Sequence, residues 1–278
     1  MSVKKISILG CGWLGLPLAR FLAGEGFAVK GSTTSEAKFA SLKAAGVEPF
    51  RIVVGETLEG DIASFLDSDI LVVNIPPERR ADVVEYHVGQ ISLLIDALAD
   101  SPVRYVLFVS STSVYPALGG EVVEADADDP DAADSPAGRA LMYVEEMLRS
   151  EAAFSTTVVR FGGLIGPGRT PAEFMQRMTE ITSPAHPVNF IHLDDCIGII
   201  SSIIRQGEWG EIFNACAPLH PARGEIYAAA AESHGLAALP EEPSSDKHFK
   251  IVNSDKLVQK LGYSFLHPDP LAMARGGS

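Results

Sequence analysis

Short apolar runs alternate with helical patterns along the first 169 residues of the chain. Residues 3–9 form an apolar, β-branched run, and apolar positions then recur at helical spacing from Leu14 to Leu22. Residues 69–75 are apolar almost throughout, which is typical of a parallel strand buried on both faces. Further strands are predicted at 27–31, 47–54, 103–109 and 156–161, and helices at 36–45, 81–99 and 135–149. This alternation predicts an α/β fold, a doubly wound parallel sheet with helices on both faces.

The alternation weakens from about residue 170, where prolines recur. We therefore expect a first domain over residues 1–169 and a smaller lobe over 170–278 that can be interleaved with the first. A chain of 278 residues is long enough to bury a core without disulfides. Its three cysteines are odd in number and lack C-x-x-C spacing, so neither a disulfide framework nor a four-ligand zinc site is indicated.

Acidic residues outnumber basic ones by 36 to 22, which gives a net charge of −14. This charge argues against nucleic acid as a partner, because binding to a polyanion needs clustered Lys and Arg. Residues 121–134 alone carry seven acidic side chains and no basic one. We interpret this segment as a solvated loop, and a flap that gates a site is the alternative.

The sequence shows no sign of secretion or membrane insertion. The first ten residues lack the length and the cleavage site of a secretory signal. No stretch reaches the roughly 18 apolar residues that a membrane span requires. We expect a cytoplasmic protein that does not enter a membrane.

A glycine-rich turn lies between the first predicted strand and the first predicted helix. Residues 10–15 read GCGWLG, a G-x-G-x-x-G pattern inside a βαβ unit. In such a turn Gly10 permits the tight bend, Gly12 lets backbone N–H groups approach a pyrophosphate, and Gly15 lets helix and strand pack closely. The helix N-terminus adds partial positive charge. The pattern predicts a dinucleotide site, and a turn without a ligand is the alternative.

The end of the second predicted strand bears on the choice of cofactor. NAD sites usually place an Asp or Glu there, where it accepts hydrogen bonds from the ribose 2′-OH. This chain has no acid at that point; Ser32, Thr33 and Thr34 form a hydroxyl cluster flanked by Lys30 and Lys38, which can accommodate a 2′-phosphate. The pattern favours NADP over NAD. NAD remains the alternative cofactor, and the small residues can equally cap the next helix.

The fourth predicted strand ends in Asn74, Ile75 and Pro76. Doubly wound sheets bind ligands at the carboxyl ends of their strands. We therefore expect these three residues to line the adenosine or ribose side of the crevice. A turn without ligand contact is the alternative.

Three motifs make the chain resemble the extended short-chain dehydrogenases/reductases, a class that includes NAD(P)-dependent nucleotide-sugar epimerases and dehydratases. They are SSTSVY at 110–115, GPG at 166–168 and NFIHLDD at 189–195, and they occur in the family's order. The glycine turn, SSTSVY and NACAPLHPAR at 214–223 are also similar to an atypical bacterial, YeeZ-like branch without an established reaction. One departure is the G-x-G-x-x-G spacing, because extended members usually carry G-x-x-G-x-x-G.

The resemblance implies a Rossmann domain that binds NAD(P) and a small C-terminal lobe that covers a small-molecule substrate, by default a nucleotide sugar. It also implies a homodimer that forms through the helices at 82–100 and 136–149. The expected cofactor contacts, from the glycine turn and the resemblance together, are Gly10, Gly12, Trp13, Leu14, Gly15, Ser32, Thr33, Thr34, Asn74, Ile75, Pro76, Ser110 and Gly162.

The family's catalytic residues are only partly present. The resemblance assigns Ser111 to hydrogen-bond the substrate oxygen, but it places the family's Tyr-x-x-x-Lys pair at Ala137 and Leu141, neither of which can move a proton. Arg139 and Tyr143 are also four residues apart, yet they project from nearly the opposite helix face, since two residues turn a helix by about 200°. Tyr143 as an acid, Arg139 as an anion holder, or water could fill the missing role. A surface Arg and a half-buried Tyr are the alternative.

Several other polar residues have both a structural and a functional interpretation. Tyr115 is a further candidate proton donor, although the resemblance makes it a pocket-wall residue, and Arg160 is equally interpretable as a structural ion-pair partner. His192 with Asp194 and Asp195 could indicate a metal or a His–Asp relay. We expect no metal, and we interpret these residues as a turn that begins a helix capped by Asp194.

Three residues remain open in the same way. His220 and Arg223 lie in the expected substrate lobe, where they could contact an anionic group or form a surface loop. Cys11 lies inside the glycine turn, and we expect it to pack beneath the turn rather than react.

Two functions follow from these patterns. The first is an NAD(P)-dependent oxidoreductase or epimerase-like enzyme that transfers a hydride at a carbonyl or alcohol carbon of a small polar substrate. The second is a cofactor-binding sensor or partner-binding protein without redox activity. Ala137 and Leu141 favour the second hypothesis.

Overall fold

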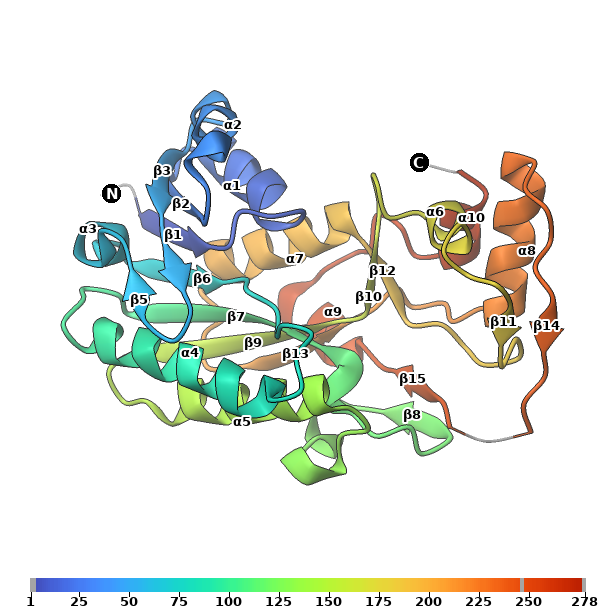
Figure 1. The fold of residues 1–278 in the computed structure, drawn as a ribbon. Helices are drawn as coiled ribbons and strands as arrows, with labels where there is room; N and C mark the ends of the chain where they lie inside the picture. The colour runs from blue at the N-terminus through green and yellow to red at the C-terminus, as the bar shows by residue number, and fades with distance from the viewer. Residues whose placement is uncertain (1–3, 246–247, 277–278) are drawn as a thin grey trace.

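The computed structural model describes residues 4–245 and 248–276 and contains a central sheet of seven parallel strands (Figure 1). The strand order is β13-β9-β7-β6-β1-β2-β3. This order confirms the predicted doubly wound α/β fold. The strands are β1 Lys5–Leu9, β2 Ala28–Thr33, β3 Glu48–Arg51, β6 Ile70–Val73, β7 Tyr105–Ser111, β9 Ser155–Phe161 and β13 Ile212–Ala215.

Helices cover both faces of the sheet, and each face has its own apolar core (Figure 1). Strand residues such as Ile8 and Val72 face one core and Leu71 and Val73 face the other, because successive side chains of a strand point to opposite faces. The first face carries α1 Gly15–Gly24, α2 Phe39–Ala44, α7 Leu193–Gln206 and α9 Asp255–Leu261. The second carries α3 Ile62–Leu66, α4 Val83–Ala99 and α5 Pro136–Ser150.

A smaller lobe with its own core lies beside the carboxyl ends of the strands, at the right of Figure 1. Its helices are α6 Pro171–Met175, α8 Arg223–His234 and α10 Pro270–Ala274. Its parallel strand pairs are β10 Gly163–Ile165 with β12 Phe190–His192, and β11 Ile181–Thr182 with β14 Glu241–Glu242. The chain after residue 170 nevertheless returns to the main sheet: β13 is one of its strands, and α7 and α9 pack against one of its faces.

Two predicted segments differ from the structure. The strand predicted at 47–54 is divided: β3 ends at Arg51, where its pairing with β2 ends, and β4 Val53–Val54 forms a short antiparallel pair with β5 Leu58–Glu59. The acidic segment 121–134 is only partly a solvated loop. It begins in β8 Gly120–Val122, which pairs with β15 Lys250–Val252, and it contains 3₁₀ turns at Glu124–Asp126 and Pro130–Ala132.

Helices α4 and α5, for which the resemblance implies a dimer contact, pack against each other beside the sheet (Figure 1). Among the described residues the large exposed apolar side chains lie on other elements, at Phe21, Leu118, Val123, Leu219, Val258 and Leu266. The dimer therefore stays a prediction. No helix in the described part of the chain is long and apolar enough to cross a bilayer.

Candidate functional site

The cavity at the glycine turn, which we call the main cavity, lies where the strand order reverses. From β1 the chain builds the sheet outward through β2 and β3, and it then starts again on the other side of β1 with β6. The loops that follow β1 and β6 therefore separate, and parallel sheets bind ligands in the crevice that this leaves. A cavity of about 490 Å³ occupies this point and is lined by the glycine turn and by Asn74.

The three glycines of the turn have different physical roles. Gly10 has a φ of +101°, and a Cβ there would lie 2.4 Å from the backbone oxygen of Asn74. A Cβ on Gly15 would lie 2.1 Å from the oxygen of Gly10, so both positions need glycine for packing. A Cβ on Gly12 would meet nothing within 4 Å. Packing within the protein therefore does not require glycine at position 12. The open space above Gly12 suits a ligand that approaches the backbone.

Neighbouring strands hold the glycine turn in shape. Ser32 on β2 accepts a hydrogen bond from the Gly10 N–H at 2.9 Å, and the Asn74 Nδ2 donates to the Gly10 oxygen at 2.9 Å. Cys11 is buried beneath the turn, as expected, and burial raises the pKa of its thiol to about 12. At the N-terminus of α1 the Leu16 N–H donates to the Gly12 oxygen at 3.1 Å and Pro17 has no N–H, so what this end of the helix offers a ligand is chiefly its partial positive charge.

The structure brings most of the expected cofactor residues to the cavity. Those that line it are Gly10, Gly12, Trp13, Leu14, Asn74, Ile75, Pro76, Ser110 and Gly162, together with Ser111. The residues that line it without having been singled out as contacts are Pro77, Val109, Leu141, Phe161, Leu164 and Arg169. Arg169 directly follows the GPG turn at 166–168, and this position after a strand is the signal that could have identified it.

The expected contacts at the end of β2 do not line the cavity. Ser32 is buried and bonds the glycine turn, the Thr33 hydroxyl bonds the backbone of Ser35, and Thr34 is exposed. The ammonium of Lys30 donates to the backbone oxygens of Ser64 and Asp67. It is therefore not available for a 2′-phosphate, which removes part of the argument for NADP.

The candidate catalytic residues divide into two groups. Ser111 lines the cavity, and its Oγ accepts a hydrogen bond from the Ser113 N–H at 3.1 Å, so its own hydroxyl hydrogen can be donated elsewhere. Leu141 on α5 also lines the cavity and is 4% exposed. Arg139 and Tyr143, on the other side of that helix, are not among the residues that line it. The structure therefore presents Leu141 where the resemblance places the family's lysine.

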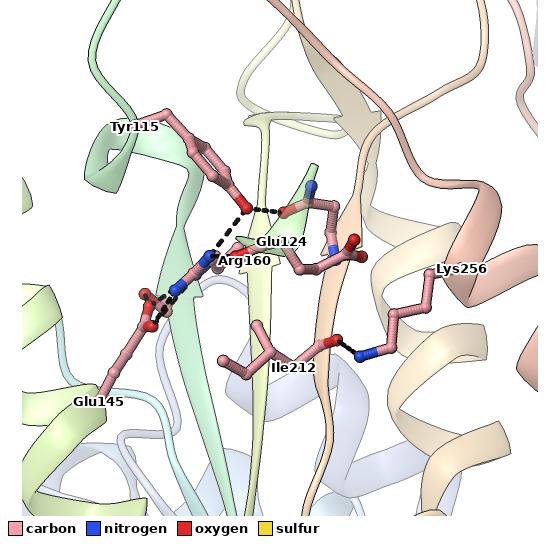
Figure 2. Close-up of polar contacts among 8 residues, drawn as sticks. Tyr115, Glu124, Glu145, Arg160, Ile212 and Lys256 are labelled. Atoms are coloured by element: carbon pink, nitrogen blue, oxygen red, sulfur yellow. Dashed lines mark hydrogen bonds and ion pairs between the residues drawn. The ribbon is translucent and has the colours of Figure 1, made fainter. Parts of the chain in front are cut away.

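A buried polar network joins β9, α5 and Tyr115 (Figure 2). The guanidinium of Arg160 on β9 binds the carboxylate of Glu145 on α5, with a shortest distance of 2.6 Å. Ser110, which lines the cavity, donates from its Oγ to Glu145 at 2.5 Å. Arg160 also donates to the backbone oxygen of Glu124 at 2.9 Å, so the acidic segment is anchored to the core at this point.

Tyr115 belongs to this network and does not line the cavity. Its hydroxyl accepts from Arg160 at 2.8 Å and donates to the Asn214 Oδ1 at 2.6 Å. The side chain is fully buried, and burial raises its pKa to about 12 in spite of the opposing effect of the Arg160 charge. These contacts make Tyr115 a structural residue rather than the missing proton donor.

The His192 turn differs from its prediction in one detail. The helix α7 is capped by His192, whose Nδ1 accepts from the Asp194 N–H at 3.2 Å, and Asp194 lies in the first turn. The fully buried Asp195 accepts from the N–H groups of Leu266 and His267 and fastens the C-terminal segment to α7. Among the described residues, one group, His192, Asp194 and His267, is close enough to share a cation. The absence of a metal site stays a prediction.

A second cavity of about 390 Å³ lies in the smaller lobe. It is lined by Arg223 and Tyr227 of α8 and by Thr112, the residue after Ser111. Arg223 donates to the backbone oxygen of Thr182 at 2.9 Å, which fixes its direction. His220 instead bonds the backbone oxygen of Val188.

Residues 6–216 match the model of the NAD-dependent epimerase/dehydratase family, and this stretch contains the glycine turn, the SSTSVY motif and both walls of the main cavity. The chain belongs to this family. It is also 33% identical to protein YeeZ of Escherichia coli strain K12 over 275 residues, which covers 98% of this chain and 99% of that protein. The assignment of the family's Tyr-x-x-x-Lys positions to Ala137 and Leu141 stays a prediction from the resemblance.

Solved structures with the same fold include family enzymes. UDP-glucuronic acid 4-epimerase from Bacillus cereus, solved in complex with NAD, has a TM-score of 0.79 and 17% identity and covers 98% of this chain and 96% of its own. A conserved protein of unknown function from Silicibacter pomeroyi has a TM-score of 0.79 and 22% identity, with 99% and 98% coverage. These likenesses show a shared fold across the whole chain, including the smaller lobe.

Proposed function

We propose that this member of the epimerase/dehydratase family binds a nicotinamide dinucleotide in the main cavity and transfers a hydride at a C–O carbon of a small polar substrate. The observation that carries the proposal is Gly12, where a Cβ would meet no atom within 4 Å although it stands between two glycines that packing requires. Open space above a helix N-terminus at the reversal of the sheet fits a pyrophosphate. When bound, the cofactor supplies or accepts the hydride.

NAD is the cofactor we propose over NADP. The sequence argument for NADP depended on the absence of an acid after β2, on the hydroxyl cluster and on two flanking lysines. In the structure Ser32 bonds the glycine turn, and the ammonium of Lys30 is held by the backbone oxygens of Ser64 and Asp67. The family to which the chain belongs is described by its dependence on NAD. Titration of the protein with NADH and NADPH, followed by nicotinamide fluorescence, tests this, and at least tenfold tighter binding of NADPH would contradict it.

Ser111 is the residue we assign to the substrate oxygen. Its Oγ already accepts the Ser113 N–H, which leaves its hydrogen to be donated to a carbonyl oxygen or shared with an alcohol. Thr112, the residue after Ser111, lines the cavity of the smaller lobe, and we assign that cavity, with Arg223 and Tyr227, to the rest of the substrate. A nucleotide-linked sugar, the kind of compound named for several structural relatives, has the length and the anionic group for this assignment.

The proton in this reaction goes to or comes from water. Hydride removal from an alcohol also releases the hydroxyl proton, and Arg169 is the single titratable side chain among the described residues that line the main cavity. An arginine does not exchange a proton near neutral pH. Leu141 stands where a lysine would assist.

That same observation supports a second candidate function, an NAD-binding sensor without turnover. The apolar Leu141 can pack against a bound cofactor, but it cannot exchange a proton or lower the pKa of a neighbouring phenol. The two functions separate in one experiment. The purified protein is incubated with NAD and a panel of nucleotide sugars and simple sugar alcohols, and both NADH absorbance and the NMR spectrum of the substrate are followed.

Ser111→Ala and Ser113→Ala form the matched pair for this experiment. Loss of a hydrogen-bond donor to the reacting oxygen lowers kcat by about 100-fold in Ser111→Ala, with NADH affinity unchanged. Ser113→Ala leaves both quantities unchanged, because the Ser113 side chain does not line the cavity. NADH binding without turnover of any compound favours the sensor. Failure of the wild-type protein to bind NADH or NADPH overturns both functions.

A further inference from the structure

The main cavity contains a single charged side chain among the described residues that line it, Arg169. The other lining side chains are apolar or uncharged, in a protein whose net charge is −14. A cation in that setting attracts anionic ligands to the one position it occupies. Within the described residues, no Asp or Glu forms an ion pair with Arg169, so its charge is not already neutralised.

Trp13 fixes the direction of Arg169. The Arg169 guanidinium carbon lies 4.5 Å from the centre of the Trp13 ring, within the range of a cation–π contact. The Trp13 Nε1–H donates to the Pro167 oxygen at 2.7 Å, which ties the turn before Arg169 to the same indole. Trp13 is itself part of the glycine turn, so these two contacts hold the guanidinium beside the N-terminus of α1.

The turn that carries Arg169 is closely constrained. Arg169 and Gly166 exchange two backbone hydrogen bonds, at 2.9 and 3.3 Å. Gly166 has a φ of +148°, and a Cβ there would lie 3.2 Å from the Trp13 ring. These contacts fix the backbone from which Arg169 extends, and the Trp13 ring limits the position of the guanidinium; preorganised groups lose less entropy on binding.

We propose that Arg169 closes over the pyrophosphate of the bound dinucleotide and holds it against the glycine turn at the N-terminus of α1. The planar guanidinium can donate two parallel hydrogen bonds to phosphate oxygens while its face stays on the indole. The charge of the arginine then complements the partial charge of the helix N-terminus from the opposite side of the pyrophosphate. This assignment rests on the proposed binding of a nicotinamide dinucleotide and adds the residue that neutralises it.

Calorimetric titration of the full-length chain with NADH, ADP-ribose and adenosine tests the assignment. ADP-ribose keeps the pyrophosphate and lacks the nicotinamide, whereas adenosine lacks both. Arg169→Ala weakens binding of NADH and ADP-ribose by about 10- to 100-fold, the usual effect of losing hydrogen bonds to a charged group, and leaves adenosine binding unchanged. Arg169→Lys retains the positive charge but lacks the two parallel N–H donors of the guanidinium, so it weakens NADH and ADP-ribose binding by an intermediate amount.

Arg177→Ala is the matched control. It removes the same charge from an exposed position of the same lobe that does not line the cavity, and it leaves all three affinities unchanged. Trp13→Phe keeps an aromatic face but loses the bond to Pro167, and it weakens NADH binding less than Arg169→Ala does. Thermal unfolding of each variant shows whether the fold is intact.

Two results would overturn the assignment while leaving the proposed function in place. One is NADH and ADP-ribose affinity in Arg169→Ala equal to that of the wild-type protein at low salt. The other is an Arg169→Ala variant that binds NADH with unchanged affinity but binds UDP more weakly. That result would mean that Arg169 binds the diphosphate of the substrate instead. A wild-type protein that binds neither NADH nor ADP-ribose overturns the proposed function itself.

Discussion

Arg160 and Glu145 form an ion pair with a shortest distance of 2.6 Å, and their side chains are only 2% and 4% exposed. Arg160 donates from Nε and Nη2 to the carboxylate, and its third nitrogen bonds Tyr115 and the backbone of Glu124. Burial disfavours the charged guanidinium, but the hydrogen bonds and charge of Glu145 outweigh this and raise the pKa of Arg160. Ser110 donates to Glu145 and also lines the cavity, so loss of the ion pair should alter the position of Ser110 at the proposed cofactor site.

Removal of one partner from this pair should be costly. Glu145→Gln keeps the size of the side chain but leaves the Arg160 charge buried without a counterion, and we expect the free energy of unfolding to fall by about 3–5 kcal/mol. Urea unfolding measures the change. Glu146→Gln, the same substitution at the exposed neighbouring residue, should change it by less than about 0.5 kcal/mol. Equal stability of the two variants would contradict the structural role of the pair.

Gly12 and Gly15 should separate ligand binding from folding. A Cβ on Gly12 meets nothing within 4 Å, so Gly12→Ala should leave the thermal unfolding temperature nearly unchanged and weaken NADH binding by at least about tenfold. A Cβ on Gly15 would lie 2.1 Å from the Gly10 oxygen, so Gly15→Ala should destabilise the fold by more than about 2 kcal/mol. Fluorescence titration and thermal unfolding check both. Unchanged NADH affinity in Gly12→Ala would count against the dinucleotide site.

The sequence was sufficient to predict the site residues that directly follow a strand of the alternating strand–helix pattern. Gly10, Gly12 and Asn74 each follow a strand of the alternating pattern, and strands of a parallel sheet end at the same edge. The role of Ser32 could not be predicted in this way. It depends on the registration of β1 against β2, which directs its hydroxyl to the Gly10 N–H instead of to a ligand.

Arg169 shows the same limit more clearly. Its place in the cavity depends on contact with Trp13, which lies far from it in the sequence, and no local pattern encodes that contact. Leu141 was identified from the motif spacing as the residue in the lysine position, and its presence in the cavity wall follows from the helix face that α5 turns to the sheet. Contacts between residues far apart in the sequence therefore determine which residues line the cavity beyond those in the motifs.

Stability should decrease as the pH falls below about 6.5, the usual pKa of an unfolded histidine. His87 is fully buried, and burial lowers its pKa although its hydrogen bond to Gln90 opposes this. The unfolded chain therefore binds more protons than the folded one below that pH, and each such histidine costs up to about 1.4 kcal/mol per pH unit. Burial lowers the pKa of His192 and His220 as well, so their effects have the same sign.

Substitution of His87 should reduce this dependence on pH. We expect the difference between the free energies of unfolding at about pH 7.5 and about pH 5.5 to be smaller in His87→Leu than in the wild-type protein, because one buried proton acceptor is gone. Urea unfolding at the two pH values measures it. His234→Gln, a substitution at an exposed histidine, should leave the difference unchanged. A wild-type difference fully retained in His87→Leu would assign the effect to other groups.

Restoration of the family's missing pair tests whether its absence limits catalysis. Leu141 already lines the cavity and Ala137 precedes it by one helical turn on the same face, so Ala137→Tyr with Leu141→Lys places a phenol and an ammonium where Ser111 meets the substrate. For any compound that the wild-type protein oxidises, we expect kcat/KM to rise by about 100-fold, the usual gain from a positioned acid or base.

The pH profile of that double variant distinguishes catalysis from altered binding. Without a titratable acid or base at the cavity, the wild-type rate of alcohol oxidation should rise about tenfold per pH unit, because the proton leaves to water. The double variant should instead reach a plateau above the pKa of the new tyrosine, which the lysine charge lowers. Arg139→Tyr with Tyr143→Lys places the same two residue types on the other side of α5, away from the cavity, and should change neither the rate nor the profile. A plateau already present in the wild-type protein would mean that an acid or base outside the cavity wall takes part, and Tyr143 would be the first residue to replace.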